Sequence, residues 1–355
     1  MTFNDVLEIK NGKNQRSVEN PDGRYPIYGS GGIMGYANDF ICCANTVIIG
    51  RKGNINKPIY VTEPFWNVDT AYGLEAKADV LIPKYLYYFC LRYDFERLNK
   101  AVTIPSLTKA DLLKIEIDLP MIDIQTDVVD RLEKIEKIID LRKQELQQLD
   151  DLIKARFVEL FDDGLSPIKT VEEMCSAIVD CPHTTPKYEG DLRNPAIRTS
   201  EIKKGYITWD TMRYVSDEEY EERVARLRPK AGDIVYGREG TFGNAAILPE
   251  GYKFCLGQRV MLLRPDYSKC TSEYLLHAVI SDDVYRQAVG KNNASTVAHV
   301  NVKDVKQFRV PLPSFEKQNE FAAFVKLVEN VKYAVKESLT EIQTLFDSLM
   351  QEYFG

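Results

Sequence analysis

Two short patterns in this chain contain the residue types of a nuclease active site, in which carboxylates bind a metal ion beside a lysine. Glu201 and Lys203 form a Glu-x-Lys pattern with Asp191 upstream, and Glu8 and Lys10 form a second one. A match of only three residues arises by chance in most chains. We therefore expect no catalysis at either place, and a stand-alone nuclease is an alternative that depends on Glu201 alone.

Two further patterns are too incomplete to carry chemistry. Asn194–Ile197 (NPAI) is similar to a base-methyltransferase motif but lacks the aromatic fourth residue that stacks on a flipped base. Gly29–Gly35 (GSGGIMG) lacks the spacing of a dinucleotide-binding loop, and no helical pattern follows it. The histidines, which show neither Ser-His-Asp nor metal-ligand spacing, are His183, His277 and His299. The chain is therefore predicted not to be an enzyme and to hold no metal or cofactor of its own.

The remaining candidates are polar, basic and aromatic side chains in loops. Arg, Lys, Asn and Gln read base edges, whereas Ser, Thr and Lys suit phosphates. In the first half the candidates are Tyr28, Ser30, Tyr36, Arg51, Lys52, Asn54, Asn56, Lys57 and Trp66. In the second half they are His183, Thr184, Thr185, Lys187, Arg198, Arg238, Thr241, Gln258 and Arg259. The alternative for each is an ordinary exposed loop side chain.

A Gly-Arg-x-Gly segment occurs once in each half, at Gly50–Gly53 and Gly237–Gly240. Glycine permits tight turns that bring the backbone close to a ligand, and both segments place an arginine between two glycines. The alternative is that the glycines only shape a turn and that the arginine forms an internal salt bridge. Two matching segments favour a shared role in binding.

The chain nearly repeats itself, and this repeat must position the candidate residues. Ile104–Pro120 superposes on Val297–Pro313 at an offset of 193 residues, which also carries Gln125 onto Gln318. The two Gly-Arg-x-Gly segments lie at an offset of 187, and insertions in loops explain the difference. The repeat predicts two similar units with internal pseudo-two-fold symmetry, which suits a partner that is itself two-sided.

A long amphipathic helix is predicted at the end of each half, over 121–163 and 315–355. Apolar residues alternate at spacings of three and four, which is a heptad seam. In the first helix the seam is Val128, Leu132, Ile135, Ile139, Arg142, Leu146, Leu149 and Ile153. In the second it is Phe321, Val325, Val328, Lys332, Val335, Leu339, Ile342 and Phe346. We expect the two helices to pair antiparallel within the chain as a coiled coil and to act as a rigid spacer about 50 Å long. The alternative is a coiled coil that dimerises the protein.

The globular parts, 1–120 and 164–314, are predicted to be α+β. Apolar runs predict buried strands, and Tyr with Leu or Val at helical spacing predicts helices. The predicted strands are Thr46–Ile49, Asp233–Tyr236 and Arg259–Leu263. The predicted helices are Lys84–Leu98 and Ser272–Val289.

Composition is that of a soluble protein, with 44% hydrophobic and 28% charged residues. No run of 18 apolar residues and no secretory signal is present, so we expect a cytoplasmic protein without a membrane partner. The odd count of seven cysteines without CxxC pairs indicates reduced thiols. The net charge of −7 divides into 0, −5, +1 and −3 over 1–120, 121–163, 164–314 and 315–355. The acidity therefore lies in the helices, and the balanced globular parts are compatible with nucleic acid.

Taken together, these segments resemble the specificity (S) subunit of type I restriction–modification systems. The matches are YPIYGSGGIMGY, VIIGRKGNINKPIYV and PFWNVDTAYG in the first half, and CPHTTPKY, RTSEIKKGYI, GDIVYGREGTFGNAAILP and VPLPSFEKQNEF in the second. The helix LPMIDIQTDVVDRLEKIEKIIDLRKQELQQLDDL is similar to the central spacer helix of that family. The resemblance covers essentially the whole chain.

The resemblance implies two target-recognition domains that read the unlike halves of a split site in double-stranded DNA, with the helices fixing the gap. It also implies two modification subunits, which bind S-adenosylmethionine and methylate adenine, and restriction subunits that translocate and cut DNA with ATP and magnesium. That chemistry would reside on the partners. The alternatives are the specificity partner of a type IIB-like system and a coiled-coil scaffold with two protein-binding heads.

Overall fold

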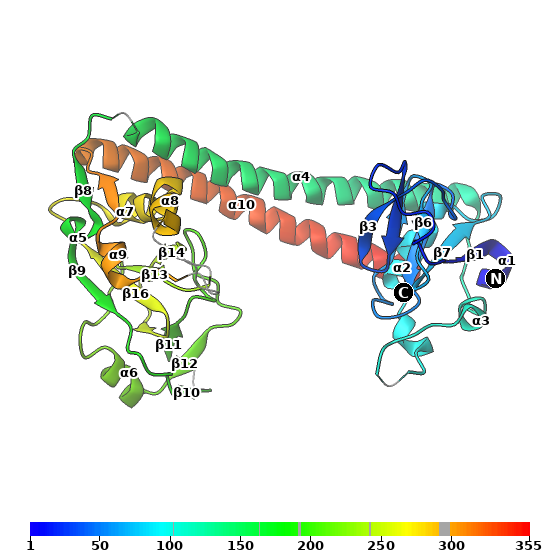
Figure 1. Cartoon of the computed structure of the whole chain (residues 1–355), viewed down its shortest axis with the longest axis horizontal. Helices are drawn as coiled ribbons and strands as arrows, with labels where there is room; N and C mark the ends of the chain where they lie inside the picture. Colours follow the sequence, from blue (N-terminus) through cyan, green and yellow to red (C-terminus); the bar gives the residue numbers. More distant parts are fainter. Residues whose placement is uncertain (102, 163, 191–192, 241–242, 291–298) are drawn as a thin grey trace. The chain divides into compact units, whose positions relative to one another are not determined.

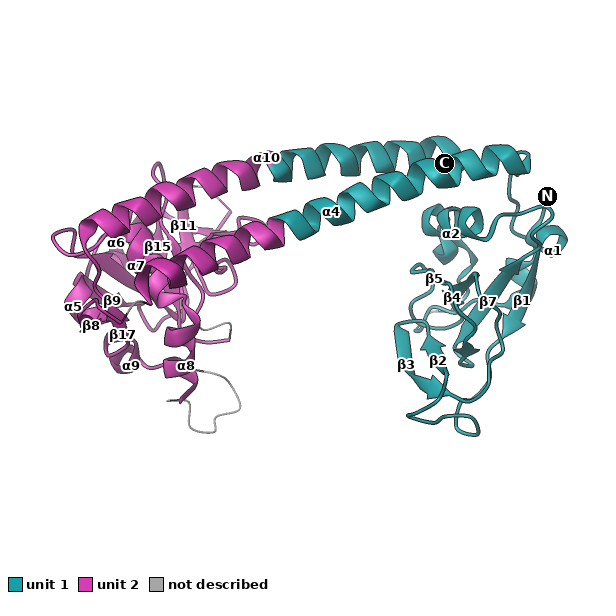
Figure 2. Ribbon diagram, turned by 90° about the horizontal axis from the view of Figure 1, so that it is seen from above, with its two compact units in different colours: residues 1–145, 335–355 teal, residues 146–334 magenta. Residues whose placement is uncertain are grey.

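The structure is a computed structural model that describes the whole chain except residues 102, 163, 191–192, 241–242 and 291–298. The chain forms two compact units, coloured separately in Figure 2. Unit 1 contains residues 1–145 and 335–355, and unit 2 contains residues 146–334. The helices α4 (Ile122–Phe161) and α10 (Phe315–Phe354), labelled in Figure 1, each contribute residues to both units, as their change of colour in Figure 2 shows.

Unit 1 is built around a four-stranded antiparallel sheet in the order β1-β7-β4-β5. A smaller sheet has the order β3-β2-β6, in which β2 and β6 are parallel. Its strands are β1 (Leu7–Asn11), β2 (Tyr25–Gly29), β3 (Gly32–Ala37), β4 (Thr46–Gly50), β5 (Ile59–Val61), β6 (Trp66–Asn67) and β7 (Ala71–Ala76). Its other helices are α1 (Phe3–Val6), α2 (Pro83–Arg92), η1 (Phe95–Leu98) and α3 (Lys109–Leu112).

Unit 2 repeats this plan. An antiparallel sheet has the order β14-β13-β16-β9, a second sheet has the order β10-β12-β11-β15 with β11 and β15 parallel, and β8 pairs with β17. Its strands are β8 (Ile168–Thr170), β9 (Cys175–Asp180), β10 (Tyr188–Glu189), β11 (Asn194–Ile197), β12 (Arg213–Val215), β13 (Ile234–Gly237), β14 (Ala245–Ile247), β15 (Cys255–Leu256), β16 (Val260–Pro265) and β17 (Arg309–Pro311). Its other helices are α5 (Val171–Met174), α6 (Asp217–Arg223), α7 (Ser272–Val279), α8 (Asp282–Gly290) and α9 (Val302–Lys306).

The two units share one strand order, because β1, β7, β4 and β5 correspond to β9, β16, β13 and β14. The parallel pair also recurs: Ile27 lies opposite Trp66 in unit 1, and Ala196 lies opposite Cys255 in unit 2. The repeat inferred from the sequence is therefore a repeat of topology, and the mixed α+β class is confirmed.

The same side-chain anchor starts α4 and α10. Gln125 is fully buried; it accepts a hydrogen bond from the Ile82 amide at 2.9 Å and donates to the carbonyl of Pro120. Gln318 is equally buried and makes the matching bonds to Thr271 and Pro313. A buried amide side chain is stable only when its polar atoms are paired, so this anchor fixes how each long helix leaves its unit.

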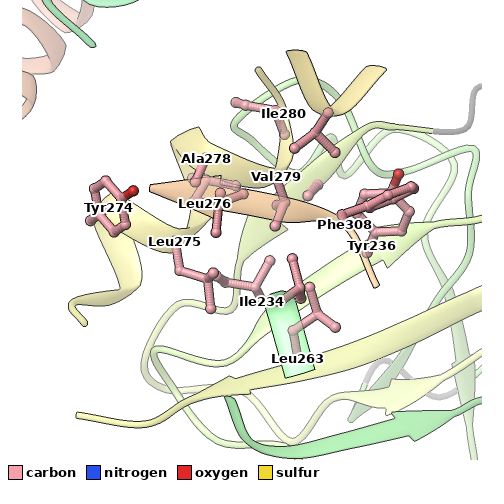
Figure 3. Packing of buried hydrophobic residues seen from close by; sticks show 14 of the residues in the cluster. Ile234, Tyr236, Leu263, Tyr274, Leu275, Leu276, Ala278, Val279, Ile280 and Phe308 are labelled. Atoms are coloured by element: carbon pink, nitrogen blue, oxygen red, sulfur yellow. The ribbon is translucent and has the colours of Figure 1, made fainter. Parts of the chain in front are cut away.

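Apolar strands and helices form the core of unit 2. Figure 3 shows Ile234, Tyr236 and Leu263 of the sheet facing Leu275 of α7 and Phe308. These side chains are fully buried, and each contributes about 1.5–3 kcal/mol from the removal of apolar surface from water. The predicted strands over 46–49, 233–236 and 259–263 correspond to β4, β13 and β16, each within a residue or two.

The two predicted globular helices are shorter than expected. The helix predicted over 272–289 is divided into α7 and α8, because the Ser281 hydroxyl caps the Val284 amide and starts a new helix. The helix predicted over 84–98 ends at Arg92, because Tyr93 is extended and Asp94 caps a short 3₁₀ helix. At each of these boundaries a local cap ends or restarts the helix, although apolar residues continue at helical spacing.

Within each unit, segments of α4 and α10 pack against each other in opposite directions. In unit 2 the Phe157 ring contacts Phe321 at a centroid distance of 5.5 Å, and Asp150 pairs with Lys332 at 2.7 Å. In unit 1, Val128 and Leu132 lie in one apolar cluster with Met350, Phe346 and Leu349. The seam residues predicted from the heptads are all buried or half-buried, as amphipathic packing requires. A continuous coiled coil along both helices stays a prediction.

Candidate nucleic-acid interface

In unit 2 most of the described candidates lie on three loops that meet at one end of the sheet, and Arg198 follows β11 of the second sheet. His183, Thr184 and Thr185 follow β9, Arg238 follows β13, and Arg259 precedes β16. The loops are joined directly. The Arg238 amide donates to the Arg259 carbonyl at 3.0 Å.

Side-chain bonds join the same loops. Arg238 pairs with Asp180 at 2.8 Å, and Asp180 also faces His183 at 3.4 Å. Gln258 donates to the Thr185 hydroxyl at 2.9 Å. Residues far apart in sequence thus form one polar surface.

The outer part of this surface is available to a ligand. His183, Thr184, Thr185 and Lys187 are exposed, and the side chain of Arg259 keeps 62% of its surface. Arg259 has a φ of +65°, a left-handed conformation that costs free energy for a residue other than glycine. Its guanidinium pairs with Glu239 at 2.9 Å. Backbone strain of this kind often marks a functional position, so Arg259 is a strong candidate contact.

Two predicted contacts are engaged inside the protein. Arg238 is 5% exposed and pairs with Asp180. The guanidinium of Arg198 pairs with Glu201 and also donates to the Thr211 carbonyl. These two arginines hold the loops in place, and the Arg238–Asp180 pair is the internal salt bridge considered as an alternative for the Gly-Arg-x-Gly segment. Thr241, also predicted to contact DNA, lies outside the described residues.

The environment of Glu201 argues against a nuclease role. Its carboxylate is fully buried and accepts hydrogen bonds from Arg198, Ser200 and Thr211. Burial raises the pKa of Glu201, but these hydrogen bonds outweigh it and hold the pKa below its usual value. Lys203 donates to the Ser200 carbonyl, so this pair does not form a metal-binding arrangement. Asp191 lies outside the described residues.

In unit 1 the exposed candidates are concentrated in the loop after β4. Arg51, Lys52, Asn54 and Lys57 are all exposed. The Arg51 guanidinium lies 5.8 Å from the centroid of the Tyr72 ring, a cation–π geometry that leaves its outer edge free for a ligand. This loop is the basic surface of unit 1 that best fits a phosphate backbone.

The other candidates of unit 1 differ in accessibility. Tyr36 is exposed, and Ser30 is half-buried. Tyr28 is half-buried with its ring 5.4 Å from that of Phe65. Trp66 is 6% exposed and donates to a loop carbonyl, and Asn56 accepts from the backbone at 2.7 Å, so these two shape the loops.

The two Gly-Arg-x-Gly segments occupy equivalent places in the two units. The carbonyl of Arg51 accepts from the Leu107 amide at 2.9 Å, and that of Arg238 accepts from the Val300 amide at 2.9 Å. The amide of Arg51 donates to the Thr70 carbonyl, as that of Arg238 donates to Arg259. The last glycine of each segment has a positive φ, +80° and +69°, so each requires glycine. The two units therefore share one loop frame, defined by these matching backbone hydrogen bonds, and this frame presents different side chains in each unit.

Sequence reasoning missed two groups at these surfaces. Arg223 lies beneath the loops of unit 2, but it ends a helix of mainly acidic residues that gives no sequence signal of such a role. Ile33 and Met34 are exposed at 56% and 62% on β3 of unit 1. The glycines around them, in a segment rejected as a nucleotide site, were the available signal.

Among the described residues, no group of three or more His, Cys, Asp or Glu side chains is placed to hold a metal ion. In the described part of the chain, no helix combines the length and apolarity that a membrane crossing requires.

The fold and these surfaces define a class: a duplicated α+β protein in which two equivalent loop frames present unlike polar surfaces. The family described as "Type I restriction modification DNA specificity domain" matches residues 1–151 and 190–344. The chain therefore belongs to the family of type I restriction–modification DNA specificity domains.

Curated relatives agree with this family. The chain is 21% identical to a putative type I restriction enzyme specificity subunit from Haemophilus influenzae, over 89% of this chain and 83% of the relative. It is also 21% identical to the type I restriction enzyme EcoBI specificity subunit from Escherichia coli, over 87% of this chain and 72% of the relative.

Solved structures show the same fold. The S subunit of a type I restriction–modification system from M. genitalium aligns with a TM-score of 0.60 at 16% identity, covering 100% of this chain and 95% of that one. A chain from a study of complex assembly and conformational transition of the type I system aligns with a TM-score of 0.62 at 15% identity, covering 100% and 96%.

Proposed function

We propose that this chain is the DNA sequence-recognition subunit of a type I restriction–modification complex and that each unit reads one half of a split double-stranded site. The observation that carries the proposal is the repeated loop frame, in which Arg51 and Arg238 make matching backbone bonds while the exposed side chains around them differ. A duplicated frame with unlike surfaces is what two unlike half-sites require. The exposed Arg, Lys and Thr side chains and the half-buried Gln258 supply contacts to phosphates and base edges.

The chemistry is proposed to lie on partner subunits. Two modification subunits would bind S-adenosylmethionine and methylate adenine, and restriction subunits would translocate and cleave DNA with ATP and magnesium. This chain would act without a catalytic residue or cofactor of its own, in the cytoplasm. The names of its relatives and the fully paired carboxylate of Glu201 support a non-catalytic role.

The long helices are proposed to fix the number of base pairs between the two half-sites. Each is a continuous α-helix of 40 residues, and such a helix is about 60 Å long. Half-sites read by pseudo-two-fold proteins lie about one turn of DNA, or roughly 34 Å, apart, which is within this length. Deletion of one heptad from a helix should shift or abolish the accepted gap. An unchanged gap would show that the helices do not set it.

The test of the whole proposal is the map of modified adenines in cells with and without this gene, obtained by single-molecule sequencing. We expect loss of methylation at one split motif with a fixed gap between two unlike halves. An unchanged map in cells that produce the full complex would contradict the proposal. Co-purification of the partner subunits distinguishes a type I complex from a type IIB-like one.

A further inference from the structure

The two units connect equivalent loops by different means. In unit 1 the loop after β1 touches the segment before β7 directly, because the Lys13 amide donates to the Asn67 carbonyl at 2.9 Å and the Trp66 indole donates back to the Lys13 carbonyl at 3.0 Å. In unit 2, Asn67 corresponds to Leu256, at the offset of 189 that relates Trp66 to Cys255 in the parallel strand pairs. The Leu256 carbonyl receives its hydrogen bond from a side chain instead.

That side chain is Arg223. Its Nε donates to the Leu256 carbonyl at 2.9 Å, and its Nη2 lies 3.4 Å from the Gly257 carbonyl. On the other loop, Nη2 and Nη1 lie 3.4 Å from the carbonyl and the hydroxyl of Thr184. One guanidinium thus bridges the loop after β9 and the segment before β16, and its planar fork of donors suits several carbonyls at once.

Arg223 is held in this position by its own helix. Its side chain is 2% exposed and pairs with Glu219 one turn earlier in α6 at 3.3 Å. Tyr220 and Val224 anchor α6 in an apolar cluster with Cys255 and other strand residues. In unit 1 the corresponding connection between β3 and β4, residues 38–45, is fully described and contains no helix. The bridge is therefore a device of unit 2 alone.

The bridged loops carry the exposed candidates. Thr184 and its neighbours His183 and Thr185 are exposed on one loop, and Gln258 and Arg259 follow Gly257 on the other. The backbone at Gly257 packs closely against Ile197, because a side-chain carbon at position 257 would lie 2.7 Å from the Ile197 carbonyl oxygen. Two side-chain connections join these loops: the exposed edge has the Gln258–Thr185 hydrogen bond, and the buried side has the Arg223 guanidinium, which contacts both loops through four donor–acceptor pairs.

We infer that Arg223 is a positioning residue for DNA recognition: it replaces the direct backbone contact of unit 1 with a side-chain spacer and so sets the separation of the two reading loops in unit 2. The inference rests on the proposed function. It makes Arg223 a determinant of sequence preference at the half-site read by unit 2, although it touches no base. A side chain that reads a base edge through two hydrogen bonds loses this geometry when it is displaced by a small distance. Discrimination between bases is therefore lost at a displacement too small to unfold the protein.

The test uses the full chain co-expressed with its modification subunits, with duplex libraries in which either half-site is randomised. Arg223→Met and the conservative Arg223→Lys are compared with Arg226→Met, which removes an exposed arginine three residues further on. Base preference at each half-site is read from methylated products, and thermal unfolding is measured in parallel. If Arg223→Met does not fold, Arg223→Lys carries the test, because it keeps the stem and one donor group.

We expect folded Arg223 variants to lose about tenfold in discrimination at one half-site and to keep the other half-site and the gap unchanged. The Arg226 variant should match the wild type. Unchanged preference at both half-sites in a folded Arg223 variant would overturn the inference, and so would an equal loss at both. Failure of the proposed function would appear differently, as absence of any split motif in the wild-type complex.

Discussion

Replacement of His277 by phenylalanine should make unit 2 less sensitive to mild acid. His277 lies on α7, with its ring centroid 5.0 Å from that of Phe321 and 6.4 Å from that of Phe157. Burial, with smaller contributions from Lys332 and Lys204, lowers the pKa of His277 from 6.5 to about 4. A phenylalanine ring fits between the same aromatic neighbours and does not titrate.

The direction and the size of this effect of pH on stability follow from proton linkage. Between pH 6.5 and about 4 the unfolded chain binds a proton at His277 that the folded chain does not, so stability falls as pH falls through this window. Above pH 6.5 both states are neutral and the effect vanishes. Between about pH 7.5 and about pH 5 this histidine alone should lower the free energy of unfolding by about 2 kcal/mol.

Urea unfolding at these two pH values measures the effect. In a Trp66→Phe background, Trp209 is the remaining tryptophan and reports on unit 2. His277→Phe should reduce the acid-induced loss by about 2 kcal/mol. Val279→Ala, a buried change on the same helix, should lower stability equally at both pH values. If His277→Phe and the parent lose the same stability on acidification, the reasoning is refuted.

Three further outcomes are expected. Alanine at Arg51 or Lys52 should weaken DNA binding by the assembled complex for all sequences and reduce the salt dependence by about one ion per lost phosphate contact, measured by titration over a range of salt. Arg238→Met leaves Asp180 without its 2.8 Å partner and should lower the free energy of unfolding by about 3 kcal/mol, whereas a double change that also neutralises Asp180 should cost less. Lys332→Ala should destabilise the helix pair of unit 2 by about 2 kcal/mol in urea, and Lys332→Met should restore most of that loss, because the apolar seam needs no ion.

The long helices and central strands could be predicted because their signals are local. The heptad seam of α4 and the apolar run of β4 each lie within one continuous stretch, and packing then buries the residues that the period selects. The division of α7 from α8 was not predicted, because a single hydroxyl at Ser281 outweighs an apolar period that continues past it.

The roles of the basic residues could be predicted only in part. Arg51 and Arg238 occupy matching sequence positions, yet Arg51 is exposed and Arg238 is buried, because β9 ends in Asp180 whereas β1 ends in Asn11. A carboxylate beside an arginine in a partly buried place forms an ion pair in preference to a solvated cation. The residue that determines whether the arginine is buried lies on another strand. The Gly-Arg-x-Gly motif alone therefore does not predict whether its arginine is exposed.

The changing offset between the halves shows where sequence variation is tolerated. It is 169 at β2, 187 at β4, 189 at β6 and 193 at the segment before α4, so insertions fall in the connections and the hydrogen-bonded frame persists. Helix α6 lies in one such insertion. Its Arg223 side chain contacts the hydrogen-bonded frame and bridges two loops. An inserted connection can thus alter the spacing of reading loops while strand order stays fixed. A single backbone plan can accordingly support two unlike surfaces in one chain.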